Sequence, residues 1–160
     1  MKPFLPTTIV RHRRENLKKC SLHGLEDRED LHFVTYPIHP VPWIENGMIL
    51  TLDAPPLSPQ DRFPLLLIDG TWKYAGVVER QLPQKEKWIR RSLPSHFRTA
   101  YPRKQTGCSD PERGLASVEA LFVAHHILGY DTTSLLDHYY WKIPFLEINS
   151  QFLLHSTIFH

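Results

Sequence analysis

The sequence predicts an α/β protein with a small, mostly parallel sheet in its first half and helices in its second half. The chain has 160 residues, enough to bury one core or two small lobes that share a core. The run Leu65–Ile68 is almost purely aliphatic, which is typical of a parallel strand buried on both faces. Leu115–Leu128 instead carries apolar residues at helical spacing. These patterns divide the chain into an α/β part, residues 1–82, and a mainly helical part, residues 83–160.

Short strands and one helix are predicted in the first part. Asp69 and Gly70 end the aliphatic strand, and Thr71–Gln81 then predicts a helix. That helix stops before Pro83, because proline cannot continue it. The earlier β-prone runs are Thr7–Arg11, His32–Tyr36 and Met48–Leu52.

Three helices are predicted in the second part. Leu115–Leu128 is followed by Gly129, at the position where a left-handed C-terminal cap is favoured. The two later helices are Leu135–Tyr140, capped by Thr132 or Thr133, and Phe145–Leu154, with Pro144 in its first turn.

Basic residues are concentrated in two windows of the chain. Residues 1–25 hold six Lys and Arg against one acid, and residues 73–104 hold nine against two. The two windows therefore carry +12, whereas the whole chain carries +2. If folding brings them together they form a surface for a polyanion such as RNA; otherwise they are two unrelated solvated faces.

Several classes of protein are not supported by the sequence. No run is long and apolar enough to cross a membrane, and Met1–Val10 is too broken for a signal peptide, so we expect a cytoplasmic protein. Cys20 and Cys108 lack a C-x-x-C spacing and are expected to be free thiols. The sequence has neither G-x-G-x-x-G nor a phosphate-binding P-loop. It also has no H-x-x-x-H, so no metal site is expected.

The stretch from Asp69 to Trp72 has the residue types of a ligand site. It brings a carboxylate to the carboxyl edge of the predicted sheet, where α/β proteins bind ligands. Gly70 allows a close approach of a ligand to the backbone, Thr71 can cap the next helix, and Trp72 offers a flat surface for a cation or a purine. The alternative is an ordinary strand–helix junction with a core tryptophan. The sequence likewise leaves two possibilities for Glu119, which faces either solvent or a site.

Seven sequence blocks carry a resemblance that spans nearly the whole chain. The chain resembles the small-subunit ribosomal RNA aminocarboxypropyltransferases and their tRNA-modifying DTW-domain relatives. No block is decisive alone, but their common order is hard to obtain by chance. The blocks are Lys19-Cys20-Ser21 with Leu25, Leu57-Ser58-Pro59 with Asp61, Ile68-Asp69-Gly70-Thr71-Trp72, Arg91-Ser92-Leu93-Pro94, Ala100-Tyr101-Pro102, Leu115-Ala116-Ser117-Val118-Glu119-Ala120 and Phe145-Leu146-Glu147-Ile148-Asn149.

The resemblance implies a SPOUT-like fold, in which a small parallel sheet with a trefoil knot precedes a helical domain. It also implies that S-adenosylmethionine binds between the two parts, with Asp69 facing the incoming RNA base. The adenine side would be enclosed by Leu57, Pro59, Trp72 and Leu93, and the sulfonium methyl by Trp72 and Ala75. The aminocarboxypropyl tail would be held by Ser21, Ala116 and Ser117, with Leu115 beside them.

The implied reaction transfers the 3-amino-3-carboxypropyl group to N3 of a uridine or pseudouridine, most simply in small-subunit rRNA. The segment Asp69–Trp72 and the segment Tyr101–Thr106 are closer to the tRNA enzymes, whereas Phe145–Asn149 is closer to the ribosomal group. A tRNA uridine aminocarboxypropyltransferase, a SPOUT RNA methyltransferase and a non-catalytic RNA-binding assembly factor therefore remain alternatives. We expect a monomer, since the helical part can cover the usual SPOUT dimer surface. The expected contacts to the RNA backbone are Arg90, Arg91, Arg103 and Lys104.

Overall fold

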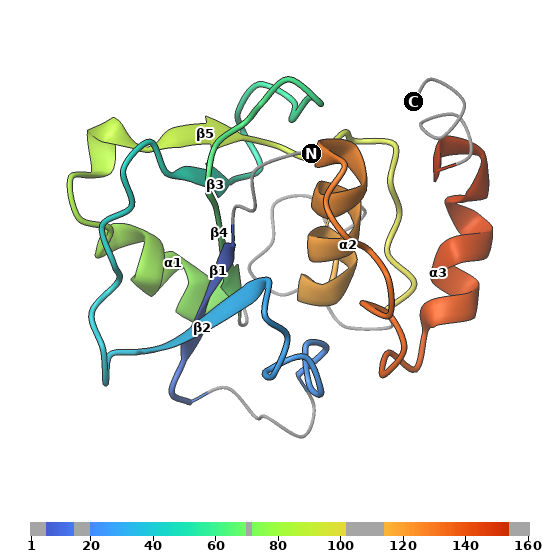
Figure 1. Ribbon diagram of the computed structural model, residues 1–160, viewed down its shortest axis with the longest axis horizontal. Helices are drawn as coiled ribbons and strands as arrows, with labels where there is room; N and C mark the ends of the chain where they lie inside the picture. The colour runs from blue at the N-terminus through green and yellow to red at the C-terminus, as the bar shows by residue number, and fades with distance from the viewer. Residues whose placement is uncertain (1–5, 15–19, 70–71, 102–113, 154–160) are drawn as a thin grey trace.

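The computed structural model describes residues 6–14, 20–69, 72–101 and 114–153, with residues 72–75 described at the backbone only (Figure 1). Its centre is a five-stranded sheet in the order β2-β1-β4-β3-β5, in which every neighbouring pair is parallel. The expected α/β class and parallel sheet are therefore confirmed. The strands are β1 Thr7–His12, β2 Leu31–Tyr36, β3 Met48–Leu50, β4 Leu65–Asp69 and β5 Ile89–Arg91.

The sequence predicted four of these strands and missed β5. Residues after 82 were expected to be mainly helical, but Ile89–Arg91 forms an edge strand beside β3. Its sequence, Ile-Arg-Arg, has one apolar residue and therefore no recognisable strand pattern. The strand is fixed instead by its parallel pairing with Met48–Leu50 of β3, and the ion pairs Arg90–Glu79 and Arg91–Asp61 accompany it. The sheet thus continues past residue 82, and the division of the chain there remains a prediction.

Three α-helices accompany the sheet, α1 Trp72–Arg80, α2 Ser117–Leu128 and α3 Lys142–Ile148, and a short 3-10 helix, η1, covers Lys85–Lys87. The predictions of α1 and α2 are confirmed, and α2 ends at Gly129 with a φ of 74° as expected for a left-handed cap. The last helix begins at Lys142, so that Pro144 lies in its first turn. Residues 150–153 are helical again after a turn at Asn149.

The predicted helix over Leu135–Tyr140 was wrong. These residues form successive tight turns, in which Leu135, Asp137 and Tyr139 each bond to the carbonyl three residues earlier. Ser134 has a φ of 63°, in the left-handed region that a right-handed helix cannot contain. The hydrogen bonds of these turns each close a single turn and do not continue as the i→i−4 bonds of an α-helix.

Helices cover both faces of the sheet. Successive strand residues point to opposite faces, so Val10, Ile49 and Leu66 pack with Val78 of α1. Their neighbours Ile9, Met48, Leu65 and Leu67 pack with α2, through side chains that include Leu121. Figure 1 shows α1 and α2 on opposite sides of β1, with α3 outside α2. Phe122 of α2 and Phe145 of α3 pack edge to face and so join α2 to α3.

The expected trefoil knot remains a prediction. The connection at residues 102–113 lies outside the described residues, and with it Arg103 and Lys104. Gly70 and Thr71 also lie outside them. Among the helices that the structure describes, none is long and apolar enough to cross a membrane.

His125 links α2 to β1 and should make folding sensitive to acid. Its Nδ1 lies 3.1 Å from the Asp131 carbonyl, so this nitrogen carries the proton, and Nε2 accepts from the Thr7 hydroxyl at 2.9 Å. Burial lowers the pKa of His125, so the folded state keeps a neutral ring.

An unfolded chain protonates this histidine near pH ~6.5, and stability should therefore fall as the pH drops below that value. We expect the urea midpoint of the wild type to fall between pH 7.5 and 5, and that of His125→Gln to fall less. Equal pH dependence in the two proteins would contradict this assignment.

Candidate functional site

The site lies where the carboxyl ends of the parallel strands meet at one edge of the sheet. β1 and β4 lie side by side at its centre. The chain leaves β1 toward β2 on one side and leaves β4 toward β5 on the other. In open α/β sheets, two adjacent strands whose connections diverge in this way open a crevice for ligands. The last paired residues of β1 and β4 are Arg11 and Asp69.

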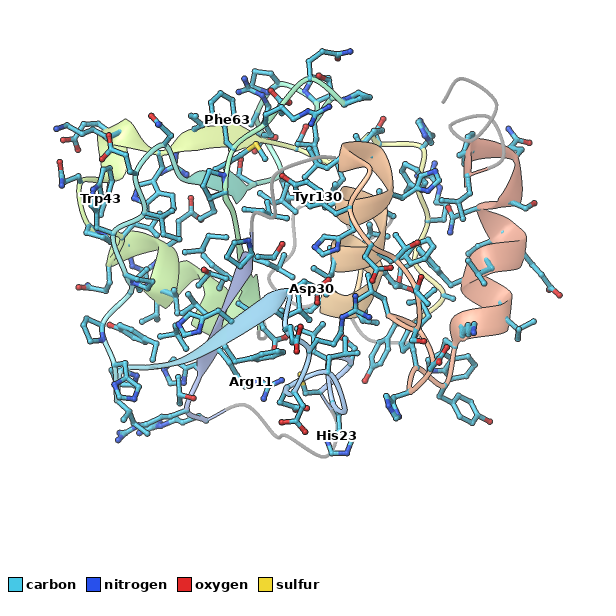
Figure 2. All side chains as sticks on the ribbon, viewed as in Figure 1. Arg11, His23, Asp30, Trp43, Phe63 and Tyr130 are labelled. Atoms are coloured by element: carbon cyan, nitrogen blue, oxygen red, sulfur yellow. The ribbon has the colours of Figure 1, made fainter. Side chains whose placement is uncertain are left out.

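Arg11 and Asp69 form a buried ion pair at this point. The Arg11 Nε donates to Asp69 Oδ2 at 3.1 Å, and the Asp69 residue is only 2% exposed. The guanidinium also reaches Glu26 at 3.4 Å and lies over the ring of Phe33. Figure 2 shows Arg11 beside the turns that follow β1, with His23 pointing away at their outer end. The carboxylate of Asp69 is thus held in place from the β1 side.

Cys20 adds a second hydrogen bond to the same carboxylate oxygen. Its thiol lies 3.0 Å from Asp69 Oδ2. Burial, together with the negative charge of Asp69, raises the pKa of Cys20 to about 12. The thiol is therefore neutral and donates a hydrogen, and the expectation of a free thiol is confirmed for this cysteine. Both hydrogen bonds reach Oδ2, and within the described residues none reaches Oδ1.

The residues expected on the adenine side come together through the loop after β3. Leu57 donates its N–H to the Ser92 carbonyl at 2.7 Å, and the Ser92 N–H bonds back to Pro55. Leu57 is buried, Leu93 is half-buried and packs against the same core, and Pro59 is exposed. This loop and the end of β5 therefore form one wall.

Arg91 and Asp61 stabilise that wall. The Arg91 Nε donates to Asp61 Oδ2 at 3.2 Å, and the same oxygen accepts the Ser58 N–H at 2.9 Å. Arg91 was expected to contact RNA, which remains a prediction; in the structure its bond to Asp61 holds the loop that contains Leu57 and Pro59.

The residues expected at the aminocarboxypropyl tail meet at the start of α2. The Ser21 hydroxyl accepts the Val118 N–H at 3.0 Å, which places the turn after β1 against this helix end. Ala116 is the N-cap residue and is buried, and Ser117 and Leu115 are half-buried beside it. The N-terminus of a helix favours negative charge, because its first N–H groups have no partner within the helix.

The backbone places Trp72 and Ala75 at the carboxyl edge of the sheet. Trp72 begins α1, directly after the carboxyl end of β4, and Ala75 lies in the first turn of that helix. The structure describes no side chain for either residue, so their expected contacts with the cofactor remain predictions.

The basic windows are only partly brought together. Lys85 and Lys87 precede β5 and therefore lie at the amino edge of the sheet, away from the site. Arg90 lies in β5 and pairs with Glu79 at 2.8 Å. Arg13 and Arg14 follow β1 at the carboxyl edge, where both are exposed.

The sequence did not determine the place of Arg11 or of Glu119. Arg11 was counted with the N-terminal basic block, although its spacing from Ile9 puts it on the inner face of β1, where a charge needs a partner. Glu119 proves to be fully buried. No group of three side chains suited to a metal occurs in the part of the chain that the structure describes.

One solved structure is similar to the chain. No protein-family model and no curated protein matches it. The similar structure is the SAM-dependent rRNA:acp-transferase Tsr3 from Vulcanisaeta distributa. It is 25% identical, with a TM-score of 0.70, and the match covers 95% of this chain and 83% of that chain. The chain therefore has a Tsr3-like α/β fold.

The raised pKa of Cys20 predicts a loss of stability in alkali. The thiol stays protonated when folded, whereas an unfolded chain releases this proton near pH ~8.5. The free energy of unfolding should then fall with a slope approaching about 1.4 kcal/mol per pH unit between these two values. Cys20→Ala should flatten this slope in urea titrations from pH 8 to 10, and an unchanged slope would contradict the neutral thiol.

Proposed function

We propose that the chain is an S-adenosylmethionine-dependent RNA aminocarboxypropyltransferase that acts on N3 of a uridine or pseudouridine, most simply in small-subunit rRNA. The observation that carries the proposal is the likeness to the SAM-dependent rRNA:acp-transferase, which extends over 95% of the chain. The fold gives independent support, since expected cofactor residues from five separate segments meet at one edge of the sheet.

The residues at this edge fit the chemistry of S-adenosylmethionine. Leu57 and Leu93 offer an apolar wall that suits an adenine, with Pro59 next to it. Ser21 and the start of α2 offer a hydroxyl and a helix N-terminus, which suit the carboxylate of an amino acid. When bound, the cofactor supplies a 3-amino-3-carboxypropyl chain whose first carbon is activated by the adjacent sulfonium.

Asp69 would act on the proton of the target base. The N3–H of uridine is weakly acidic, and a carboxylate can accept or orient its proton. Arg11 and Cys20 hold Asp69 through Oδ2, and no bond to Oδ1 occurs within the described residues, so Oδ1 would be the oxygen that meets the base. Their two hydrogen bonds also fix the carboxylate in one orientation, so the acceptor is in place before RNA arrives.

We also propose the finer family assignments that the resemblance implies. The chain would belong to the DTW-domain group of SPOUT-like proteins, with the trefoil knot and a helical C-terminal part. The monomeric state and the cytoplasmic location remain predictions of the same kind.

The decisive experiment follows two labels of the cofactor into RNA. Purified protein is incubated with small-subunit rRNA or tRNA and with S-adenosylmethionine labelled in its carboxyl carbon or in its methyl group. We expect carboxyl label in a nucleoside of the rRNA. Label in tRNA would assign the tRNA reaction, and methyl label would make the protein a methyltransferase. Transfer of neither label would contradict the proposed enzyme and favour the assembly factor.

Asp69 and Trp72 should affect different steps. We expect Asp69→Asn to be less stable, because Arg11 then keeps only Glu26 as an acidic partner among the described residues, and to turn over about 100- to 10,000-fold more slowly where it is folded, as for a lost general base. Its affinity for S-adenosylmethionine should fall much less than its turnover. Trp72→Ala should weaken cofactor binding in calorimetry. Unchanged turnover of Asp69→Asn would mean that Asp69 has no part in the chemistry. Normal affinity of Trp72→Ala would mean that Trp72 is a core residue rather than a cofactor contact.

RNA should approach the carboxyl edge, which has exposed arginines. We expect Arg13→Gln/Arg14→Gln to weaken RNA binding and to reduce its salt dependence, by about 0.7–0.9 in slope for each phosphate that the variant no longer neutralises. Arg90→Gln tests its expected role at the RNA backbone in the same way.

The matched control is Lys85→Gln/Lys87→Gln, which removes the same charge from the amino edge of the sheet. Its salt slope should equal that of the wild type. Equal reductions in the two double variants would mean that net charge alone drives binding. An unaltered slope in Arg90→Gln would remove Arg90 from the RNA-binding surface.

A further inference from the structure

Glu119 is a fully buried carboxylate that joins three separate segments of the chain. It lies in the first turn of α2 and receives four hydrogen bonds. The Thr99 hydroxyl and the Ala116 N–H donate to Oε1 at 2.6 and 2.7 Å. The Ala100 N–H and the Tyr139 hydroxyl donate to Oε2, each at 2.9 Å.

All four donors are uncharged, and within the described residues no cation pairs with Glu119. A buried carboxylate is costly unless its oxygens are well satisfied, and here both oxygens accept two hydrogens. Hydrogen bonds are directional, whereas apolar packing is not. The arrangement therefore fixes the relative positions of its donors more strongly than apolar packing would.

The donors include the segments that would form the cofactor site. Ala116 is the N-cap of α2, beside the residues expected at the aminocarboxypropyl tail. Thr99 and Ala100 follow the wall of Leu93. The Thr99 hydroxyl also accepts the Tyr101 N–H at 3.0 Å, which extends the connection by one residue.

We propose that Glu119 is a positioning residue, which holds the start of α2 and the segment after β5 in the geometry that binds S-adenosylmethionine. The inference rests on the proposed function. Glu119 does not touch the cofactor in this account and acts through the backbone of Ala116 and Ala100. Its loss should therefore lower cofactor affinity more than its effect on global stability would explain.

Asn149 provides a matched control, because it is equally buried and anchors the same segment from another side. Its side chain exchanges two hydrogen bonds with the backbone of Arg98 and donates a third to the Phe145 carbonyl. None of these three bonds reaches the start of α2. A variant at Asn149 loses buried hydrogen bonds without freeing Ala116.

The test compares Glu119→Gln with Asn149→Ala. The glutamine keeps the shape, but its amide nitrogen cannot accept, so two of the four donors lose their partner. At a temperature where circular dichroism shows both variants folded, calorimetry should give a Kd for S-adenosylmethionine raised at least about tenfold in Glu119→Gln. Asn149→Ala should keep the Kd of the wild type, even if its Tm falls as far.

Hydrogen exchange without cofactor supplies a second measurement. Glu119→Gln should exchange faster at residues 99–101 and 116–118, whereas Asn149→Ala should leave residues 116–118 unchanged. If Glu119→Gln does not fold, Thr99→Val removes one donor to Glu119, together with the acceptor of the Tyr101 N–H, and should raise the Kd by about threefold.

The outcomes separate this inference from the proposed function. Wild-type protein that does not bind S-adenosylmethionine would overturn the proposed function, and the positioning role for that cofactor with it. Wild-type binding with an unchanged Kd in Glu119→Gln, or in Thr99→Val if that variant replaces it, would overturn the positioning role alone. Equal losses of affinity in Glu119→Gln and Asn149→Ala would also overturn it, because affinity would then follow stability.

Discussion

The ion pair between Arg11 and Asp69 is the interaction on which the site depends. It joins β1 to β4 where their connections diverge, and both side chains are almost fully buried. Removing one partner of such a pair leaves an uncompensated buried charge, which costs about 3–5 kcal/mol. Two residues from the turns after β1 add further contacts, because Cys20 donates to Asp69 and Glu26 pairs with Arg11. Those turns also carry Ser21, so the pair ties the centre of the sheet to the start of α2.

Hydrogen bonds between loops, rather than further elements of the sheet, complete the site. Ser92 holds the loop after β3, and Glu119 holds the segment after β5 against α2. These bonds join residues far apart in the sequence, and the parallel sheet supplies the edge where they meet. Two buried polar side chains, Glu119 and Asn149, thus hold the segment of residues 98–100, which has no regular secondary structure.

The sequence predicted the parts of the fold that local pattern determines. Leu65–Ile68 was recognisable as a buried strand because every residue is aliphatic, and Gly129 marked the end of α2. β5 and the turns around Ser134 were not predictable, because β5 depends on its pairing with β3 and Arg28 donates to the Thr133 carbonyl in those turns. Asp69 was expected at the carboxyl edge of the sheet because it directly follows a strand, and it lies there. The burial of Glu119 and the pairing of Arg11 appear only when distant segments are brought together.

Hydrogen exchange of the wild-type protein with and without S-adenosylmethionine tests whether the carboxyl edge of the sheet binds this cofactor. We expect slower exchange with cofactor in residues 20–25, 55–61 and 114–118, which meet at this edge. Residues 43–47 and 83–88, which precede β3 and β5 at the opposite edge, should not change. Protection confined to these last two segments, or no protection anywhere, would mean that the cofactor does not bind at the carboxyl edge.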